Sequence, residues 1–355
     1  MTRSPVVGVV THPRDRHPSG KFPGFETIIN CLILRLYLWG YPQVGTTSWT
    51  EKTLIESGLF YPPTVKTPEA RLNYYASKFP ITEVDSSYYA LPSERNAAAW
   101  VERTPKAFVF HVKAFRLFTR HPTEPSKLPK DLQQALLPAG KKNLYYDDVP
   151  PEITDQLWAR FRGALQPLQA AGKLGTVLCQ FPAWFIPNRD GYAHLLLCAE
   201  RLHGMPVAVE FRNAIWFDEP RRERVLGFLR EHQLVHVVVD EPQGFRSSLP
   251  AVWEVTSPRL ALVRFHGRNK EMWEKKRLSS AAERFNYSYS EAELRNLARH
   301  AKELAEKAAE THALFNNCYR DYGQRNGNPA PIESGLAATA TFTQESKPSL
   351  IESSP

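Results

Sequence analysis

A regular alternation of short apolar segments with longer helical patterns constrains the fold of this chain more than any other feature. Strands that alternate with helices predict a parallel sheet with helical cover. The strand candidates are Val44–Ser48, Ile81–Asp85, Phe108–Lys113, Thr176–Gln180, Val207–Phe211, Val235–Asp240, Leu260–His266 and Ala313–Asn317. The clearest helix candidates are Glu69–Phe79, Pro151–Ala171, Arg189–Leu202, Glu219–Glu231 and Glu291–Glu310, the last opened by a capping box at Ser290–Glu293.

The length of the alternating region favours closure of the sheet into a barrel. A (β/α)8 barrel takes about 250 residues, and residues 43–328 supply that length with room for long loops. An open doubly wound sheet usually carries a Gly-rich phosphate fingerprint after its first strand, and none is present. We therefore predict an α/β fold, a TIM-like barrel of parallel strands with outer helices. Residues 1–42 read as an irregular extension, and residues 329–355, rich in Ala, Thr, Ser and Pro, as a disordered tail.

Composition limits the cellular setting more than the activity. The formal net charge of +8 invites an anionic partner, although a solvated basic surface explains it equally well. The four cysteines form no CxxC pair, so neither a disulfide framework nor a structural zinc site is predicted. The apolar run at residues 28–39 is shorter than the ~20 residues of a spanning helix, and no secretory signal is evident. We expect a cytoplasmic protein without a membrane partner.

Charged side chains cluster at the carboxyl ends of the strand candidates. Residues two apart on a strand share a face, so Glu210 and Arg212 point the same way in PVAVEFR, and Arg264 and His266 do so in LALVRFHG. Charged groups are rarely buried unless they are paired or used. Active sites of TIM barrels lie at this end of the strands, which predicts a site there.

The candidate residues come from nearly every predicted strand. Catalytic candidates are Glu83, Glu210, His266 and Asp240, the last placed on one face of the sixth strand with His236 and Val238. Substrate-binding candidates are Lys113, Gln180, Arg212, Arg264, Asn317, Trp49 and Tyr88. A passive network, with Glu210 paired to Arg264 and Glu83 to Lys113, is the structural alternative.

Each candidate has a chemical role that its residue type suggests. Burial and neighbouring cations tune carboxylates for general acid/base work, which favours Glu83 and Glu210. His266 suits a proton shuttle, and the three cations Arg212, Arg264 and Lys113 suit an anionic group. The acidic candidates and His266 include ligand types for a divalent metal, but no HxH or HExxH spacing supports one, so we name no metal site and keep a divalent metal only as the less favoured alternative. No organic cofactor is indicated.

Two further features are candidate parts of a binding site. The segment at residues 264–284 is basic, with Lys275–Arg277 its densest run, and it follows the seventh strand, near where many barrels bind phosphate. A solvated loop offset by its own glutamates is the alternative. Aromatic residues near the strand ends offer a stacking wall for a sugar or base, or simply pack loops onto the rim.

Eight motifs occur in order along residues 43–328: GTTSW at Gly45–Trp49, FYPP at Phe60–Pro63, YYASKFPITEVDSSYYALPS at Tyr74–Ser93, TPKAFVFHVKA at Thr104–Ala114, GKLGTVLCQFP at Gly172–Pro182, AVEFRNAIW at Ala208–Trp216, RFHG at Arg264–Gly267 and FNNCYRDYGQRNG at Phe315–Gly327. Together they resemble the YecE-like family, domain of unknown function 72. The resemblance implies a TIM-like barrel, a cleft built from the candidates above, and no established activity. Asp85 stands where Asn is common in the family, and Asn213 where His is common.

We therefore expect an enzyme that applies carboxylate acid/base chemistry to a polar or anionic small substrate, such as a sugar phosphate or nucleotide derivative. Hydrolase and isomerase or lyase reactions both fit this chemistry. A nucleic-acid-associated protein or nuclease that uses the basic loop, and a non-catalytic ligand-binding sensor, are the alternatives. The pattern does not predict the substrate or the oligomeric state.

Overall fold

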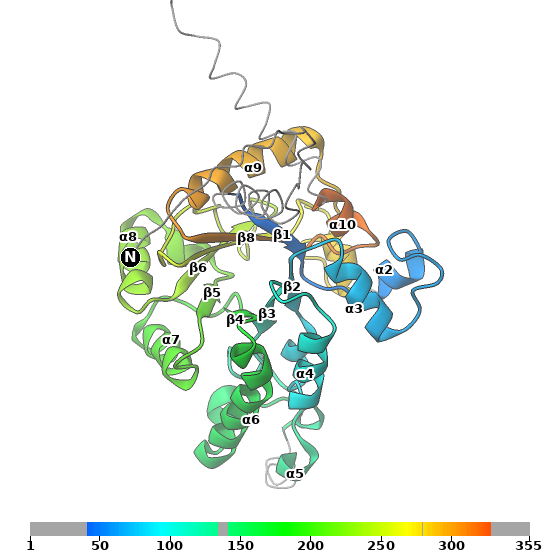
Figure 1. Cartoon of the computed structure of the whole chain (residues 1–355). Coiled ribbons are helices and arrows are strands. Elements are labelled where there is room, and N and C mark those ends of the chain that lie inside the picture. Colours follow the sequence, from blue (N-terminus) through cyan, green and yellow to red (C-terminus); the bar gives the residue numbers. More distant parts are fainter. Residues whose placement is uncertain (1–40, 134–140, 279, 328–355) are drawn as a thin grey trace, which may run out of the picture. The chain divides into compact units, whose positions relative to one another are not determined.

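The computed structural model describes residues 41–133, 141–278 and 280–327. Its eight strands form a closed barrel in which each strand runs parallel to the next and β8 pairs back with β1 (Figure 1). The strands are β1 (Gln43–Thr46), β2 (Ile81–Val84), β3 (Val109–Lys113), β4 (Leu174–Gln180), β5 (Val207–Glu210), β6 (Val235–Asp240), β7 (Leu260–Phe265) and β8 (Glu310–Phe315). The predicted TIM-like barrel is confirmed.

Helices surround the barrel and connect its strands (Figure 1). They are α2 (Lys52–Ser57), α3 (Pro68–Ala76), α4 (Glu94–Glu102), α5 (Lys130–Gln133), α6 (Pro151–Ala170), α7 (Arg189–Arg201), α8 (Glu219–Glu231), α9 (Glu291–Ala305) and α10 (Tyr322–Asn326). The predicted capping box of α9 is present, with the Ser290 and Glu293 side chains each bonded to the other residue's backbone. No helix within the described ranges is long and apolar enough to cross a membrane.

The largest differences from the predicted elements lie at the end of α9 and at α4. The last long helix ends at Ala305 rather than Glu310, and Glu310 opens β8 opposite Leu260 of β7. Pairing along the barrel therefore overrides the helical preference of the Ala, Glu and Lys residues there. Helix α4 lies between two predicted strands, as the alternation requires, but it was not among the clearest helix candidates, although Ser93 caps it by accepting from the Asn96 N–H. The predictions for residues 1–42 and 329–355 fall almost wholly outside the described residues.

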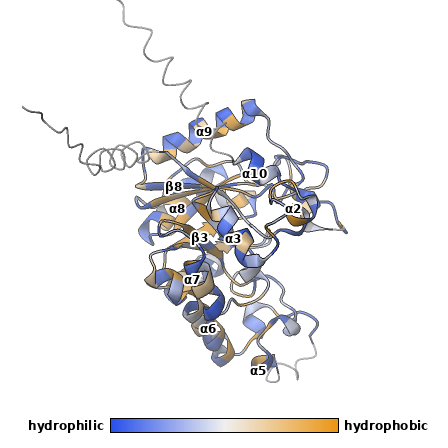
Figure 2. Ribbon diagram, turned by 45° about the vertical axis from the view of Figure 1, so that its right-hand side comes forward, coloured by the Kyte–Doolittle hydropathy of each residue, from blue (hydrophilic) through white to orange (hydrophobic). Residues whose placement is uncertain are grey.

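The direction of the β7 side chains fixes which residues face the barrel interior. Val263 and Phe265 pack in one apolar cluster with Leu294 and Leu297 of α9, so this face of β7 is covered by the helix. Because side chains alternate along a strand, Leu262 and Arg264 face inward. Figure 2 shows the same division on α9, whose apolar residues gather on one side. The buried position of Arg264 thus follows from the strand pattern.

Candidate functional site

Arg264 connects opposite walls of the barrel. Its guanidinium donates to Glu83 of β2 at 2.8 Å and to Glu210 of β5 at 2.5 Å. The three side chains are essentially inaccessible to solvent. Strands two, five and seven meet only across the barrel interior, so this triad fills the interior near the carboxyl ends of the strands. The predicted pair of Glu210 with Arg264 is confirmed, whereas Glu83 pairs with Arg264 rather than with Lys113.

The two carboxylates of the triad differ in their protonation. Burial raises the pKa of Glu83 to about 7, and the positive charges of Arg264 and Lys113 only partly oppose this effect. Burial acts in the same direction on Glu210, but Arg212 and Arg264 outweigh it and hold the pKa of that carboxyl well below its usual range. Two carboxylates whose pKa values are pushed apart are the usual arrangement of an acid and a fixed anion.

A third buried carboxylate, Glu241, was not among the predicted site residues. It follows β6 directly, accepts from Arg212 at 2.9 Å and from the Leu249 N–H at 2.6 Å, and burial raises its pKa to about 7. Arg212 also lies 2.6 Å from Glu210. Three glutamates therefore share two arginines in the upper barrel. The one available signal was the position of Glu241 immediately after the strand that ends in Asp240.

His266 lies beneath the rim of the barrel and contacts Glu210. Its Nε2 is 3.3 Å from the carboxylate, and its Nδ1 is 2.7 Å from the side-chain amide of Asn316. Burial and the nearby Arg212 lower the pKa of His266 to about 3, so the ring is neutral at neutral pH. A neutral, fully enclosed ring favours a positioning role for His266 over the predicted proton shuttle.

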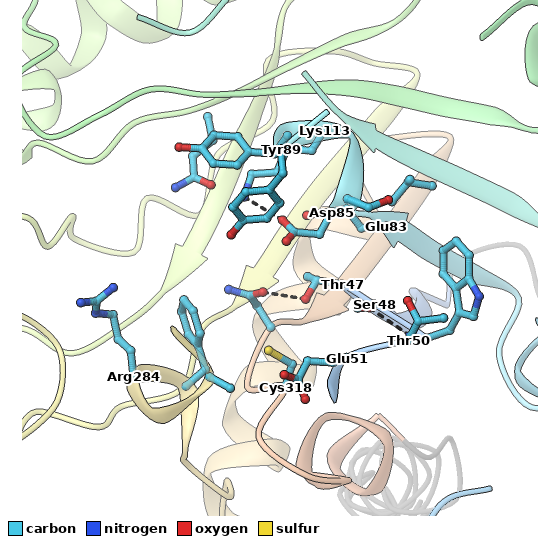
Figure 3. A pocket seen from close by; sticks show the side chains of 18 of the residues that line it. Thr47, Ser48, Thr50, Glu51, Glu83, Asp85, Tyr89, Lys113, Arg284 and Cys318 are labelled. Carbon is cyan, nitrogen blue, oxygen red and sulfur yellow. Dashed lines mark hydrogen bonds and ion pairs between the residues drawn. The ribbon is translucent and has the colours of Figure 1, made fainter. Parts of the chain in front are cut away.

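A pocket of about 500 Å³ opens above the triad at the carboxyl ends of the strands (Figure 3). Of the three triad residues, Glu83 is the one that lines it. The Oε2 atom of Glu83 is buried and has no hydrogen-bond partner among the described residues. Because a buried polar atom without a partner is costly, this oxygen is a place where a ligand would donate a hydrogen bond.

Lys113 and its neighbours form one wall of the pocket. Its ammonium group donates to Asp85 at 2.9 Å (Figure 3). It also lies 4.7 Å from the centre of the Tyr88 ring. Gln180 and Trp49 also line the pocket, and the Trp49 ring packs edge-on against that of Trp100. The structure thus brings these substrate-binding candidates together around one cavity.

Asp240 does not join the other carboxylates. It is bonded to Arg268 at 2.7 Å and to the Tyr289 hydroxyl at 2.7 Å, and Tyr289 packs against Phe265 on the helix-facing side of β7. The face of β6 that ends in Asp240 therefore points away from the interior, and Asp240 does not line the pocket, unlike the cleft position that the family resemblance implies. Valines occupy the inward positions of β6, whereas His236 shares the outward face with Asp240, so the polar pattern indicated the wrong side.

Asn317 is also placed elsewhere than expected. Its amide donates to the Tyr287 carbonyl and to the Asn326 side chain, so it ties loops together outside the pocket. The preceding residue, Asn316, lines the pocket and accepts from Thr47 at 2.6 Å. Because β8 ends at Phe315, the two asparagines lie beyond the strand, and the alternation rule could not decide which of them faces the pocket.

The described residues contain no cluster of three or more His, Cys, Asp or Glu side chains arranged to hold a metal ion. Among the cysteines, Cys179 and Cys198 are buried free thiols, and Cys318 is a free thiol that lines the pocket. Burial raises the pKa of the Cys318 thiol to about 12, which makes it a poor nucleophile.

Comparison with known proteins places the chain. A family model described as protein of unknown function DUF72 matches residues 43–331. The chain belongs to this family. It is 33% identical over 276 residues to the UPF0759 protein YunF of Bacillus subtilis, covering 77% of this chain and 88% of that protein.

Solved DUF72 structures share the fold of this protein. A crystal structure of a DUF72 protein from Enterococcus faecalis has a TM-score of 0.67 at 26% identity, covering 83% of this chain and 95% of that one. A DUF72 structure from Thermotoga maritima has a TM-score of 0.64 at 29% identity, covering 84% and 99%. The DUF72 description carries no activity, so the function must be argued from the site.

The raised pKa of Glu83 predicts a pH-dependent contribution to stability. A carboxyl with a pKa near 7 when folded and 4.5 when unfolded keeps its proton on folding, so its contribution is full below pH 4.5 and is lost as pH rises through 7. We expect the free energy of unfolding of the wild type, relative to Glu83→Gln, to fall by about 3 kcal/mol between pH 4.5 and 7.5. Urea unfolding at several pH values measures it. Exposed Glu56→Gln is the control, and a difference independent of pH would contradict the prediction.

Proposed function

We propose that this DUF72 protein is an enzyme in which Glu83 is the general acid or base for a small polar substrate that carries an anionic group. The observation that supports this most is the state of Glu83. Glu83 lines the pocket, its Oε2 atom has no hydrogen-bond partner in the described part of the chain, and its pKa is about 7. A carboxyl with those properties is poised to give or take a proton near neutral pH.

The residues beneath the pocket support Glu83. Glu210 stays ionised and contacts Arg264, which in turn donates to the Oε1 atom of Glu83. The donor at Oε1 leaves Oε2 to exchange the proton with substrate. Glu210, which does not line the pocket, then acts as a positioning residue through its negative charge rather than on the reacting atoms.

The pocket wall suits a small substrate with several polar groups. Its volume of about 500 Å³ lies within the range of small-molecule sites. Lys113 and Arg212 offer positive charge, Gln180 an amide and Tyr88 an aromatic face, all within one cavity. These are features that bind a sugar phosphate or a nucleotide derivative, and either a hydrolase or an isomerase or lyase fits a single carboxyl with a pKa near 7.

A ligand screen tests the proposal while the substrate is still unidentified. The wild type and Glu83→Gln are compared by thermal shift against sugar phosphates, nucleotides and sugar acids, and each ligand that stabilises the wild type is assayed for turnover. We expect at least one such compound to be converted by the wild type and bound, but not converted, by Glu83→Gln. Compounds that bind without turnover by the wild type would support a ligand sensor instead.

A further inference from the structure

The loop after β7 brings a second guanidinium to the pocket. Arg284 belongs to the short 3-10 helix η6 (Ala281–Phe285) and lines the pocket together with Arg212. It donates from Nε to the Trp273 carbonyl at 2.7 Å and from Nη2 to the Lys275 carbonyl at 3.3 Å. These bonds hold the side chain against its own loop, but a backbone carbonyl does not neutralise its charge.

The other cations of the pocket already have carboxylate partners. Lys113 is paired with Asp85, and Arg212 with Glu210 and Glu241. Within the described ranges, no carboxylate forms an ion pair with Arg284. Partial burial, followed by the repulsion of Arg212, lowers the pKa of Arg284. A half-buried positive charge beside another of the same sign is unfavourable unless an anion lies between them.

An independent observation also points to a ligand. Figure 3 shows Arg284 on the opposite side of the pocket from Glu83. The Oε2 atom of Glu83 is buried without a partner among the described residues, so this wall fits a ligand hydroxyl, which can either donate to the carboxylate or accept from the protonated carboxyl. The wall with Arg284 requires negative charge. A ligand that meets both requirements has a hydroxyl at one end and an oxyanion at the other.

We propose that Arg284 and Arg212 form the subsite for the phosphate group of a hydroxylated substrate, which makes the β7 loop a specificity-determining element. The guanidinium fork matches the oxygen spacing of a phosphate, and the loops after strands seven and eight commonly bind phosphate in barrels of this fold. Arg212 lines the same pocket with its Nη atoms held by Glu210 and Glu241, so within the described part of the chain Arg284 is the guanidinium of this subsite that has no carboxylate partner. This inference rests on the proposed function, because it names the class of substrate for the same pocket.

The test uses inorganic phosphate as the probe and the full-length protein. Titration calorimetry measures the affinity for phosphate of the wild type, Arg284→Met and Lys275→Met. A titration with chloride at equal ionic strength gives the background. Lys275 lies on the same loop, is exposed and does not line the pocket, so it is the matched control. Because a hydrogen bond to a charged group contributes roughly 1.5–3 kcal/mol, we expect Arg284→Met to weaken phosphate binding by about tenfold or more. We expect Lys275→Met to change it less than about twofold.

Two outcomes would overturn the inference. One is equal phosphate affinity in the wild type and Arg284→Met. The other is an equal loss in Lys275→Met, which would indicate non-specific attraction to a basic loop. Arg284→Lys, which keeps the charge without the fork, should bind with intermediate affinity, and wild-type affinity in this variant would contradict recognition by the fork.

Glu83→Gln separates this inference from the proposed function. We expect Glu83→Gln to keep phosphate binding while it loses turnover. Turnover that survives in Glu83→Gln, combined with phosphate binding that depends on Arg284, would disprove the acid/base role and leave the subsite standing. Turnover that is lost in Glu83→Gln, combined with phosphate binding that does not depend on Arg284, would disprove the phosphate subsite and leave the acid/base role standing.

Discussion

Arg264→Met is expected to lower the free energy of unfolding by about 3–5 kcal/mol at pH 8. The substitution removes the one guanidinium that contacts both Glu83 and Glu210 inside the barrel. Two carboxylates would then remain in a site closed to solvent, and an uncompensated buried charge is far more costly than the pair it came from. Urea unfolding followed by circular dichroism gives the measurement.

The pH dependence of this loss separates charge from packing. At pH 5.5 Glu83 in the variant should be protonated, because its pKa is already about 7 in the presence of Arg264 and rises further without it. We therefore expect a clearly smaller loss at pH 5.5 than at pH 8. Adding Glu83→Gln and Glu210→Gln to Arg264→Met should restore most of the stability at pH 8, and a loss that is unchanged by pH and by these additions would indicate a packing defect instead.

Glu83→Gln is expected to lower kcat by about 10²–10⁴-fold for the substrate found by the screen. The amide keeps the size of the side chain but neither gives nor takes a proton near neutral pH. KM should change much less, since the groups that hold the substrate are untouched. Glu56→Gln, on the exposed side of α2, is the control and should leave kcat unchanged. A kcat for Glu83→Gln within threefold of the wild type would argue against the role.

The positioning role of Glu210 has its own signature. Its negative charge is one of the influences that raise the pKa of Glu83. Glu210→Gln should therefore shift the midpoint of the pH–kcat profile to lower pH, while Glu83→Gln abolishes that ionisation. A profile that rises with pH through 7 assigns Glu83 as base, and one that falls assigns it as acid.

Much of this architecture was predictable from simple alternation. The strand–helix repeat predicts the barrel, and the two-residue period predicts that Glu83, Glu210 and Arg264 all face its interior. Those predictions succeed because each of these strands, as the structure bounds it, has one charged side chain among uncharged neighbours, so the sequence shows which face carries the charge.

For the remaining site residues, strand alternation did not indicate correctly which side chains face the pocket. In β6 the polar residues His236 and Asp240 share the outward face, and Asp240 and Glu241 at its end point to opposite sides, so pattern alone selected the wrong carboxylate. Asn316 and Asn317 follow β8, beyond the regular alternation. Arg284 comes from a long loop, and its approach to the pocket depends on backbone contacts with Trp273 and Lys275. Loop placement of this kind is set by tertiary structure.

The most direct test of the central claim is the protonation of Glu83 itself, which needs no substrate. Protein labelled with carbon-13 at the glutamate side-chain carboxyl is titrated by NMR, and the Glu83 signal is assigned by its absence from Glu83→Gln. We expect a carboxyl that titrates near pH 7 and disappears in this variant. A Glu83 signal that titrates near 4.5, as an ordinary exposed glutamate does, would contradict the acid/base role.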